Sequence, residues 1–349
     1  MKRRFKVGWS LILAAVMLFS VVACSLPDDK VVRVYNWGDY IDPTVCDKFE
    51  EETGYKVIYD MFDTNEDMYT KLVNSKTKYD VLFPSDYMTE RMIDEDMLAE
   101  INFANVPNYA NVDSTYKDLS YDPDNKYSIP YMWGTLGILY NKTMVSEKPT
   151  SWNALWDEQY SQSIFMLNSQ RDAIGATMML LGYDLNCTDD DAIAQVKQKL
   201  VDQAPLVLAY LVDDYKDKMI AGEAALALAW QGDAVYCIDK NPVLDYVIPE
   251  EGSNIFYDTV CIPKSCGNKA GAEAFINFLC RPDIAALNAA YIGYSTPISA
   301  ARELMGEAGA NVIAYPDLSL YKLEIFSALG DKNKIYDMVW TEITTSVGI

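Results

Sequence analysis

Short apolar runs alternate with amphipathic segments along this chain. Near its start, residues 31–34, 55–62 and 79–84 have the apolar, partly alternating composition of strands, whereas residues 44–53 and 65–75 have the composition of helices. Strands that alternate with helices in this way predict an α/β domain with a parallel sheet. Such sheets bind their ligands beyond the carboxyl ends of the strands, so the residues that follow each strand are the first candidates for a site.

The first of these helices has clear signals at both ends. Asp42 is a short polar residue suited to the N-cap, and Pro43 suits the first helical position because its missing N–H needs no partner there. Gly54 is a natural C-terminal residue of a helix. We therefore expect a helix that begins at Pro43 and stops at Gly54.

The alternation continues from Tyr127 to the end of the chain. We expect strands at 127–141, 163–169 and 255–263, helices at 150–160 (capped by Thr150 or Ser151) and 172–183, a strand, turn and helix within 224–238, a helical segment at 270–291 broken at Pro282, and a terminal helix at 332–344. With 349 residues, of which 50% are hydrophobic, the chain is too long for one compact core and long enough for two domains.

The N-terminal segment has the pattern of a secretory signal. Four basic residues within positions 2–6 precede an apolar run at 7–22, which is too short and too early for a typical membrane span. The run ends in Val-Val-Ala-Cys, which resembles a bacterial lipobox, so we expect residues 1–23 to be a signal peptide, Cys24 to be lipidated, and residues 24–30 to form a lipid-anchored tether. The alternatives are an ordinary signal peptide with a coincidental cysteine and an uncleaved anchor.

The charge balance narrows the class of partners. The chain has a formal net charge of −22 from 29 basic and 51 acidic side chains, and loss of the four basic residues of the signal peptide would make it −26. Such a surface repels nucleic acid, whose binders need clustered Lys and Arg, and it raises the encounter rate of cations. Solubility explains most of these charges equally well, so acidity alone identifies no ligand.

The content of histidine and cysteine excludes several kinds of chemistry. The chain has no histidine, which removes Ser-His-Asp and Cys-His catalysis and the usual histidine-containing zinc sites. Six cysteines follow Cys24, and none belongs to a C-x-x-C pair. Several lie in apolar runs, so we expect mostly free thiols, with Cys261 and Cys266 as the pair that could join. The chain also lacks a Walker A sequence, a G-x-G-x-x-G sequence, an EF-hand loop and a G-x-S-x-G elbow, so we expect no cofactor and no metal.

Aromatic residues recur beside acids in the expected loops. The groups are Trp37 with Asp39 and Tyr40, Ser85 and Asp86 with Tyr87, Trp230 with Asp233, and Phe256 and Tyr257 with Asp258. Each group alone is typical of a core aromatic beside a helix N-cap. Together they favour an aromatic box lined with carboxylates, which suits an organic ammonium. A carboxylate supplies charge-assisted hydrogen bonds, an aromatic face adds about 0.5 to 2 kcal/mol, and both are needed to offset the loss of water.

The same stretches resemble the extracytoplasmic polyamine-binding proteins of spermidine/putrescine ABC importers. The resemblance spans roughly residues 31–300 and is carried by "YNWGDYIDP", "YDVLFPSDYMTERM", "YSIPYMWGTLGILYN", "TSWNALWDEQY", "NPVLDYVIPEEG", "AFINFLCRPDIAA" and "YIGYSTP". It implies an α/β, two-lobed type II periplasmic-binding-protein fold with crossing hinge segments. The implied lobes are 31–135 with 258–303, and 136–257 with 304–349.

The resemblance also implies a set of ligand-binding residues: Trp37, Asp39, Tyr40, Ser85, Tyr87, Asp172, Trp230, Asp233, Phe256, Asp258 and Tyr294. The chain departs from the spermidine-preferring pattern at three of the matching positions. Ser169 replaces a second acid, Phe256 replaces a tryptophan, and Asp233 replaces a small residue as in the putrescine-selective pattern. Tyr87 matches the spermidine pattern instead, so the mixture leans towards putrescine and leaves spermidine open.

The function implied by the resemblance is capture of a polyamine outside the cytoplasmic membrane and delivery to an ABC permease with a separate ATPase. We expect a monomeric receptor that is not an enzyme. Asp39 and Asp233 would hold one ammonium of the ligand, and Asp172 and Asp258 the other. The alternatives are a receptor for another organic cation, a polyamine-sensing adaptor and, from a different class, a secreted hydrolase that uses paired carboxylates.

Overall fold

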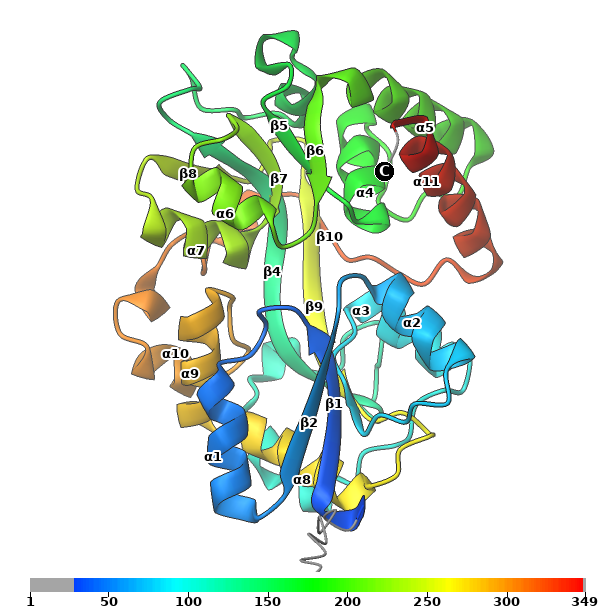
Figure 1. Cartoon of the computed structure of the whole chain (residues 1–349), viewed down its shortest axis with the longest axis vertical. Coiled ribbons are helices and arrows are strands. Elements are labelled where there is room, and N and C mark those ends of the chain that lie inside the picture. The colour runs from blue at the N-terminus through cyan, green and yellow to red at the C-terminus, as the bar shows by residue number, and fades with distance from the viewer. Residues whose placement is uncertain (1–27, 348–349) are drawn as a thin grey trace, which may run out of the picture.

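Ten strands form one curled, mixed sheet in the computed structural model, which describes residues 28–347 (Figure 1). The strand order is β2-β1-β3-β9-β4-β7-β5-β6, with β8 paired to β4 and β10 paired to β9. The expected signal peptide, Cys24 and most of the tether lie outside the described residues. Within residues 28–347, no helix combines the length and the apolar run that crossing a membrane requires.

The lower lobe of Figure 1 contains the N-terminal strands. Strand β1 (Val31–Trp37) lies between β2 (Lys56–Phe62) and β3 (Val81–Leu82) and is parallel to both. Two groups of helices flank them: α1 (Pro43–Thr53), α2 (Asn65–Asn74) and α3 (Asp86–Asp94) follow along the chain, and α8 (Lys269–Leu279), α9 (Pro282–Ile292) and α10 (Ser299–Leu304) return to this lobe later.

The upper lobe of Figure 1 repeats this architecture. Strand β5 (Ile164–Leu167) is parallel to both of its neighbours, β6 (Val207–Leu211) and β7 (Leu226–Trp230). The helices of this lobe are α4 (Gln170–Leu181), α5 (Asp190–Gln203), α6 (Tyr215–Ile220), α7 (Gln231–Lys240) and α11 (Asn333–Val347).

Two long buried strands run through both lobes. Strand β4 (Ser128–Asn141) pairs antiparallel with β9 (Ser253–Cys261) in its first half and with β7 and β8 (Leu244–Val247) in its second half. The short strand β10 (Leu323–Glu324) adds a third segment beside the start of β9. The two-lobed α/β fold is therefore as expected, whereas the lobe boundaries given above stay a prediction.

Local signals predicted the ends of the first helix correctly. The Asp42 carboxylate accepts a hydrogen bond from the Thr44 backbone N–H, Pro43 is the first helical residue, and Gly54 adopts a left-handed φ of 72°. The break at Pro282 and the terminal helix are also confirmed.

The α-helix predicted at 150–160 is wrong. This segment forms two 3₁₀ turns, Trp152–Trp156 and Glu158–Tyr160, with Ser151 as the first cap. The Asp157 side chain accepts a hydrogen bond from the Gln159 N–H, and such a local bond competes with a continuing helix. The two strand limits that matter for the site also differ: β3 has only two residues, and β7 leads into α7 without an intervening turn.

The six described cysteines are all free thiols, as expected for most of them. The suggested pairing of Cys261 with Cys266 is wrong, because the Cys266 thiol instead donates a hydrogen bond to Asp80 Oδ1 at 3.2 Å. That carboxylate also accepts hydrogen bonds from the backbone of Gly267 and Asn268, so it organises the loop after β9 without a disulfide.

Candidate ligand-binding site

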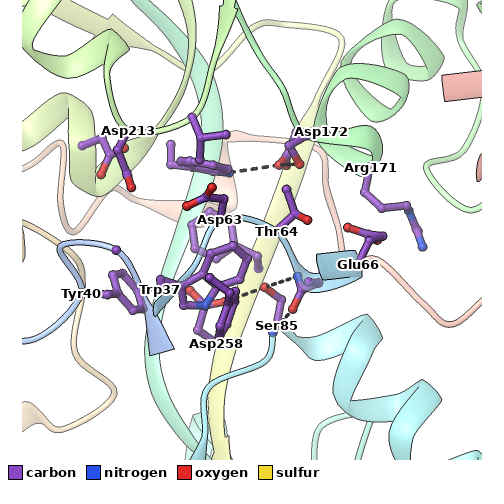
Figure 2. A pocket seen from close by; sticks show the side chains of 18 of the residues that line it. Trp37, Tyr40, Asp63, Thr64, Glu66, Ser85, Arg171, Asp172, Asp213 and Asp258 are labelled. Atoms are coloured by element: carbon purple, nitrogen blue, oxygen red, sulfur yellow. Dashed lines mark hydrogen bonds between the residues drawn. The ribbon is translucent and has the colours of Figure 1, made fainter. Parts of the chain in front are cut away.

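A narrow pocket of about 70 Å³ lies where the two lobes face each other (Figure 2). Every residue that the sequence suggested lines it: Trp37, Asp39, Tyr40, Ser85, Tyr87, Asp172, Trp230, Asp233, Phe256, Asp258 and Tyr294. The structure thus brings the whole predicted set together, and its binding role stays a prediction.

The ends of parallel strands deliver most of these side chains to the pocket. Trp37 ends β1. Strand β5 is followed after two residues by α4, and β7 leads directly into α7; the first turns of these helices carry Asp172 and Asp233. The positive ends of these helix dipoles therefore face the pocket and favour carboxylates at these positions.

Asp258 is a buried acid in the lower part of the pocket as seen in Figure 2. It lies in β9 and is 5% exposed, and its two oxygens accept hydrogen bonds from the hydroxyls of Tyr40 at 2.5 Å and Ser85 at 2.7 Å. Burial raises the pKa of Asp258 to about 6, although both hydrogen bonds act in the opposite direction. The protein therefore leaves the negative charge of Asp258 without a full counter-charge.

Asp172 has a similar environment in the upper lobe. It is 7% exposed, and its Oδ2 accepts hydrogen bonds from the Ser169 hydroxyl at 2.6 Å and the Trp230 indole N–H at 3.2 Å. Burial and, to a smaller extent, the nearby Glu66 carboxylate raise the pKa of Asp172 to about 6, although these two hydrogen bonds act in the opposite direction. Ser169, which replaces an acid of the spermidine-preferring pattern, thus serves to orient Asp172.

Asp233 is held by two tyrosines. Its carboxylate accepts hydrogen bonds from the hydroxyls of Tyr215 at 2.9 Å and Tyr294 at 3.0 Å. The Tyr294 ring lies directly against Gly232, where an added methyl group would overlap the ring. Glycine at this position therefore allows the lower-lobe tyrosine to reach the upper-lobe acid.

Asp39 differs from the other acids, because its side chain is 73% exposed and its ion-pair partner is Lys216 of this chain. The residue has a left-handed φ of 45°, at the turn that follows β1. The preceding Gly38 lies so close to Asp213 that a Cβ there would be 2.5 Å from the Asp213 Oδ2. Asp39, which was expected to bind an ammonium of the ligand, thus already pairs with the ammonium of Lys216.

An aromatic wall continues around the pocket. The Tyr40 ring meets the Tyr294 ring edge-on at a centroid distance of 4.8 Å, and Phe256 lies 6.2 Å from the same ring. Trp37 packs against Phe62 at 4.6 Å and donates its indole N–H to the Phe83 carbonyl at 2.8 Å. These contacts fix the rings in place around the pocket.

Sequence reasoning missed several charged residues of the pocket. Glu66 accepts a hydrogen bond from the Tyr87 hydroxyl at 3.0 Å, and burial raises the pKa of Glu66. Arg171 is 3% exposed, and its guanidinium lies over the rings of Tyr87 and Phe326 at 4.8 and 4.5 Å. The other charged residues missed are Asp63, Asp213 and Lys216. No group of side chains that could hold a metal ion occurs in the described part of the chain.

Comparisons with known proteins point to one family. The family model described as "Bacterial extracellular solute-binding protein" matches residues 44–318. The chain is 35% identical over 341 residues to the spermidine/putrescine-binding periplasmic protein of Escherichia coli (strain K12), which covers 96% of this chain and 98% of that protein.

Two solved structures have a fold similar to that of this chain. The spermidine/putrescine ABC transporter substrate-binding protein PotD of Streptococcus pneumoniae is 39% identical with a TM-score of 0.76, over 91% of this chain and 99% of that chain. The Tp0655 (TpPotD) lipoprotein of Treponema pallidum is 26% identical with a TM-score of 0.79, over 90% and 99%.

Proposed function

This chain belongs to the bacterial extracellular solute-binding proteins, and we propose that it binds a polyamine, putrescine or spermidine, outside the cytoplasmic membrane and delivers it to an ABC permease. The observation that carries this proposal is the pair of buried carboxylates, Asp172 and Asp258, in an aromatic pocket between the lobes. Relatives whose names state spermidine/putrescine binding support it.

The two carboxylates are suited to the two ends of a diamine. Asp258 is held by the lower-lobe residues Tyr40 and Ser85, whereas Asp172 is held by the upper-lobe residues Ser169 and Trp230. We therefore assign one ammonium to Asp258 and the other to Asp172, in place of the pairing expected from the sequence. A ligand that binds both acids bridges the lobes and stabilises the closed state.

The remaining features of the proposal follow from the resemblance. The mature protein is held at the extracytoplasmic face of the membrane by a lipid on Cys24, and the lipoprotein among the solved relatives supports this. It acts as a monomer without catalytic residues or a cofactor, and the permease subunits and a separate ATPase carry out transport.

Calorimetric titration with putrescine, spermidine, cadaverine and a set of amino acids tests the proposal. We expect binding of at least one polyamine at micromolar concentration or below. The substitutions Asp172→Asn and Asp258→Asn should each weaken that binding by about 1.5 to 3 kcal/mol, the scale of a hydrogen bond to a charged group. The matched control is Asp47→Asn, an exposed acid of α1 remote from the pocket. Binding only to an amino acid, or equal affinity in all three variants, would refute the proposal.

A further inference from the structure

Lys216 places a cation of the protein inside a pocket that collects carboxylates. It is the second residue of α6, and its side chain is 11% exposed. Its ammonium lies 3.4 Å from Asp39 Oδ2 and 3.4 Å from Asp213 Oδ1. Burial lowers the pKa of Lys216, but the carboxylates of Asp233, Asp213 and Asp39 outweigh burial, so the pKa lies above its ordinary value and the ammonium stays charged.

Lys216 lies between two cavities and lines both of them. The ligand-binding pocket adjoins a second, larger groove of about 870 Å³, whose far side comes from α7 and α9. Five residues line both cavities: Asp39, Asp213, Lys216, Asp233 and Tyr294. A ligand too long for the pocket would therefore have to pass these residues to extend into the groove.

The opposite end of the pocket also carries a cation. Figure 2 shows Arg171 and Glu66 on one side of the site and Asp213 on the other. The Arg171 guanidinium donates hydrogen bonds to the Ser327 carbonyl at 3.1 Å and to Asn186 Oδ1 at 2.9 Å. These acceptors are neutral, and the Arg171 charge acts on the nearby carboxylates of Glu66 and Asp172, where it opposes the rise in their pKa that burial causes. Two fixed cations thus stand on opposite sides of the site.

We propose that Lys216 determines specificity by closing the Asp233 end of the pocket to a third ammonium, so that the site prefers a diamine to a triamine. This inference rests on the polyamine-binding function proposed above. A diamine places its two ammonium groups at Asp258 and Asp172. The third ammonium of spermidine, extended past the Asp258 side, would meet the Lys216 ammonium where that group already pairs with Asp39 and Asp213, and like charges repel.

Removal of the lysine charge should reverse the preference. In a Lys216→Met variant the apolar stem remains, and Asp39, Asp213 and Asp233 lose their cation. The third ammonium of spermidine can then take the place of the lysine ammonium. We expect the ratio of the spermidine Kd to the putrescine Kd to fall at least about tenfold, as expected when a close like-charge contact is removed.

Two further variants make the experiment specific. Lys216→Arg keeps the charge and should keep the wild-type ratio. Lys218→Met removes an exposed lysine of the same helix, which pairs with Glu223, and should leave both affinities unchanged. In thermal unfolding, spermidine should raise the Tm of the Lys216→Met variant more than putrescine does, which a purely structural role of the lysine would not produce.

The outcomes separate this inference from the proposed function. A wild-type protein that binds neither polyamine overturns both. A wild-type protein that binds a polyamine, with the same Kd ratio in the Lys216→Met variant, overturns the specificity role of Lys216 alone. Equal loss of affinity for both ligands in that variant also overturns it, because it would show that Lys216 only supports the shape of the pocket.

Discussion

Ligand binding to this pocket should release protons near pH 6. Burial raises the pKa of both Asp172 and Asp258 to about 6, so a large fraction of each carboxyl is protonated in mildly acidic solution. A bound ammonium favours the ionised form of each acid and lowers its pKa. The proton that occupies each carboxyl must therefore leave when the cation binds.

The size of the effect follows from these two values. With both pKa values at about 6, each acid is about 50% protonated at pH 6 and about 1% protonated at pH 8, so binding releases about one proton at pH 6 and almost none at pH 8. If both acids must be ionised in the complex, the apparent Kd rises about fourfold from pH 8 to pH 6 and about 100-fold, or roughly 2.8 kcal/mol, from pH 8 to pH 5.

Calorimetry in two buffers of different ionisation enthalpy measures this release directly. The apparent binding enthalpy at pH 6 should depend on the buffer with a slope of about one proton, and the slope should halve in an Asp258→Asn variant. The Asp47→Asn control should behave like the wild type. A binding enthalpy independent of the buffer at pH 6, together with a Kd that stays constant from pH 8 to pH 5, would refute the reasoning.

Three further predictions concern the support of the site. Because the pKa of Asp172 is raised from 3.8 to about 6, its charge lowers the stability of the folded protein above pH 6 and has no such effect below about pH 4. From pH 8 to pH 4, the free energy of unfolding of the wild type should therefore rise by up to about 3 kcal/mol more than that of Asp172→Asn. Chemical unfolding measures both rises, and equal rises would contradict this prediction. Gly232→Ala should displace the Tyr294 ring and cost about 1 to 3 kcal/mol of stability together with affinity, whereas Gly267→Ala, where a Cβ has room, should cost little. Ser169→Ala removes a hydrogen bond to the Asp172 carboxylate and should weaken polyamine binding by about 1 kcal/mol, with a larger loss at pH 6 than at pH 8; calorimetry at the two pH values checks it.

The elements that could be predicted from the sequence are those with local causes. Asp42, Pro43 and Gly54 set the ends of α1 through contacts within a few residues, so their pattern was sufficient. The segment at 150–160 was mispredicted because its apolar spacing suits an α-helix, while Asp157 forms a competing local bond that the spacing does not show.

The site divides in the same way. The aromatic and acidic residues that follow strands could be predicted because they recur in the same order as in the polyamine-binding proteins. Glu66 and Lys216 could not, because each lies in a helical segment among other charged residues and looks like part of an exposed face. Arg171 could not either, because a single arginine at the start of a helix has no pattern that indicates a binding site. The contacts that bring them to the pocket join residues far apart in the sequence, such as the Arg171 guanidinium over the Tyr87 ring and the Lys216 ammonium beside Asp39.

The paired strands β4 and β9 also determine how such a molecule is expected to move. All residues of both strands are buried. The antiparallel pairing between them runs from Ser128 to Thr135 of β4 and has one register shift, between Pro130 and Met132. A two-stranded ribbon of this kind can bend perpendicular to its plane without losing its hydrogen bonds. Sliding of one strand along the other would break all of these hydrogen bonds at once. The lobes should therefore swing about one axis and return to the same alignment after each release, so that the two carboxylates meet each new ligand at the same spacing.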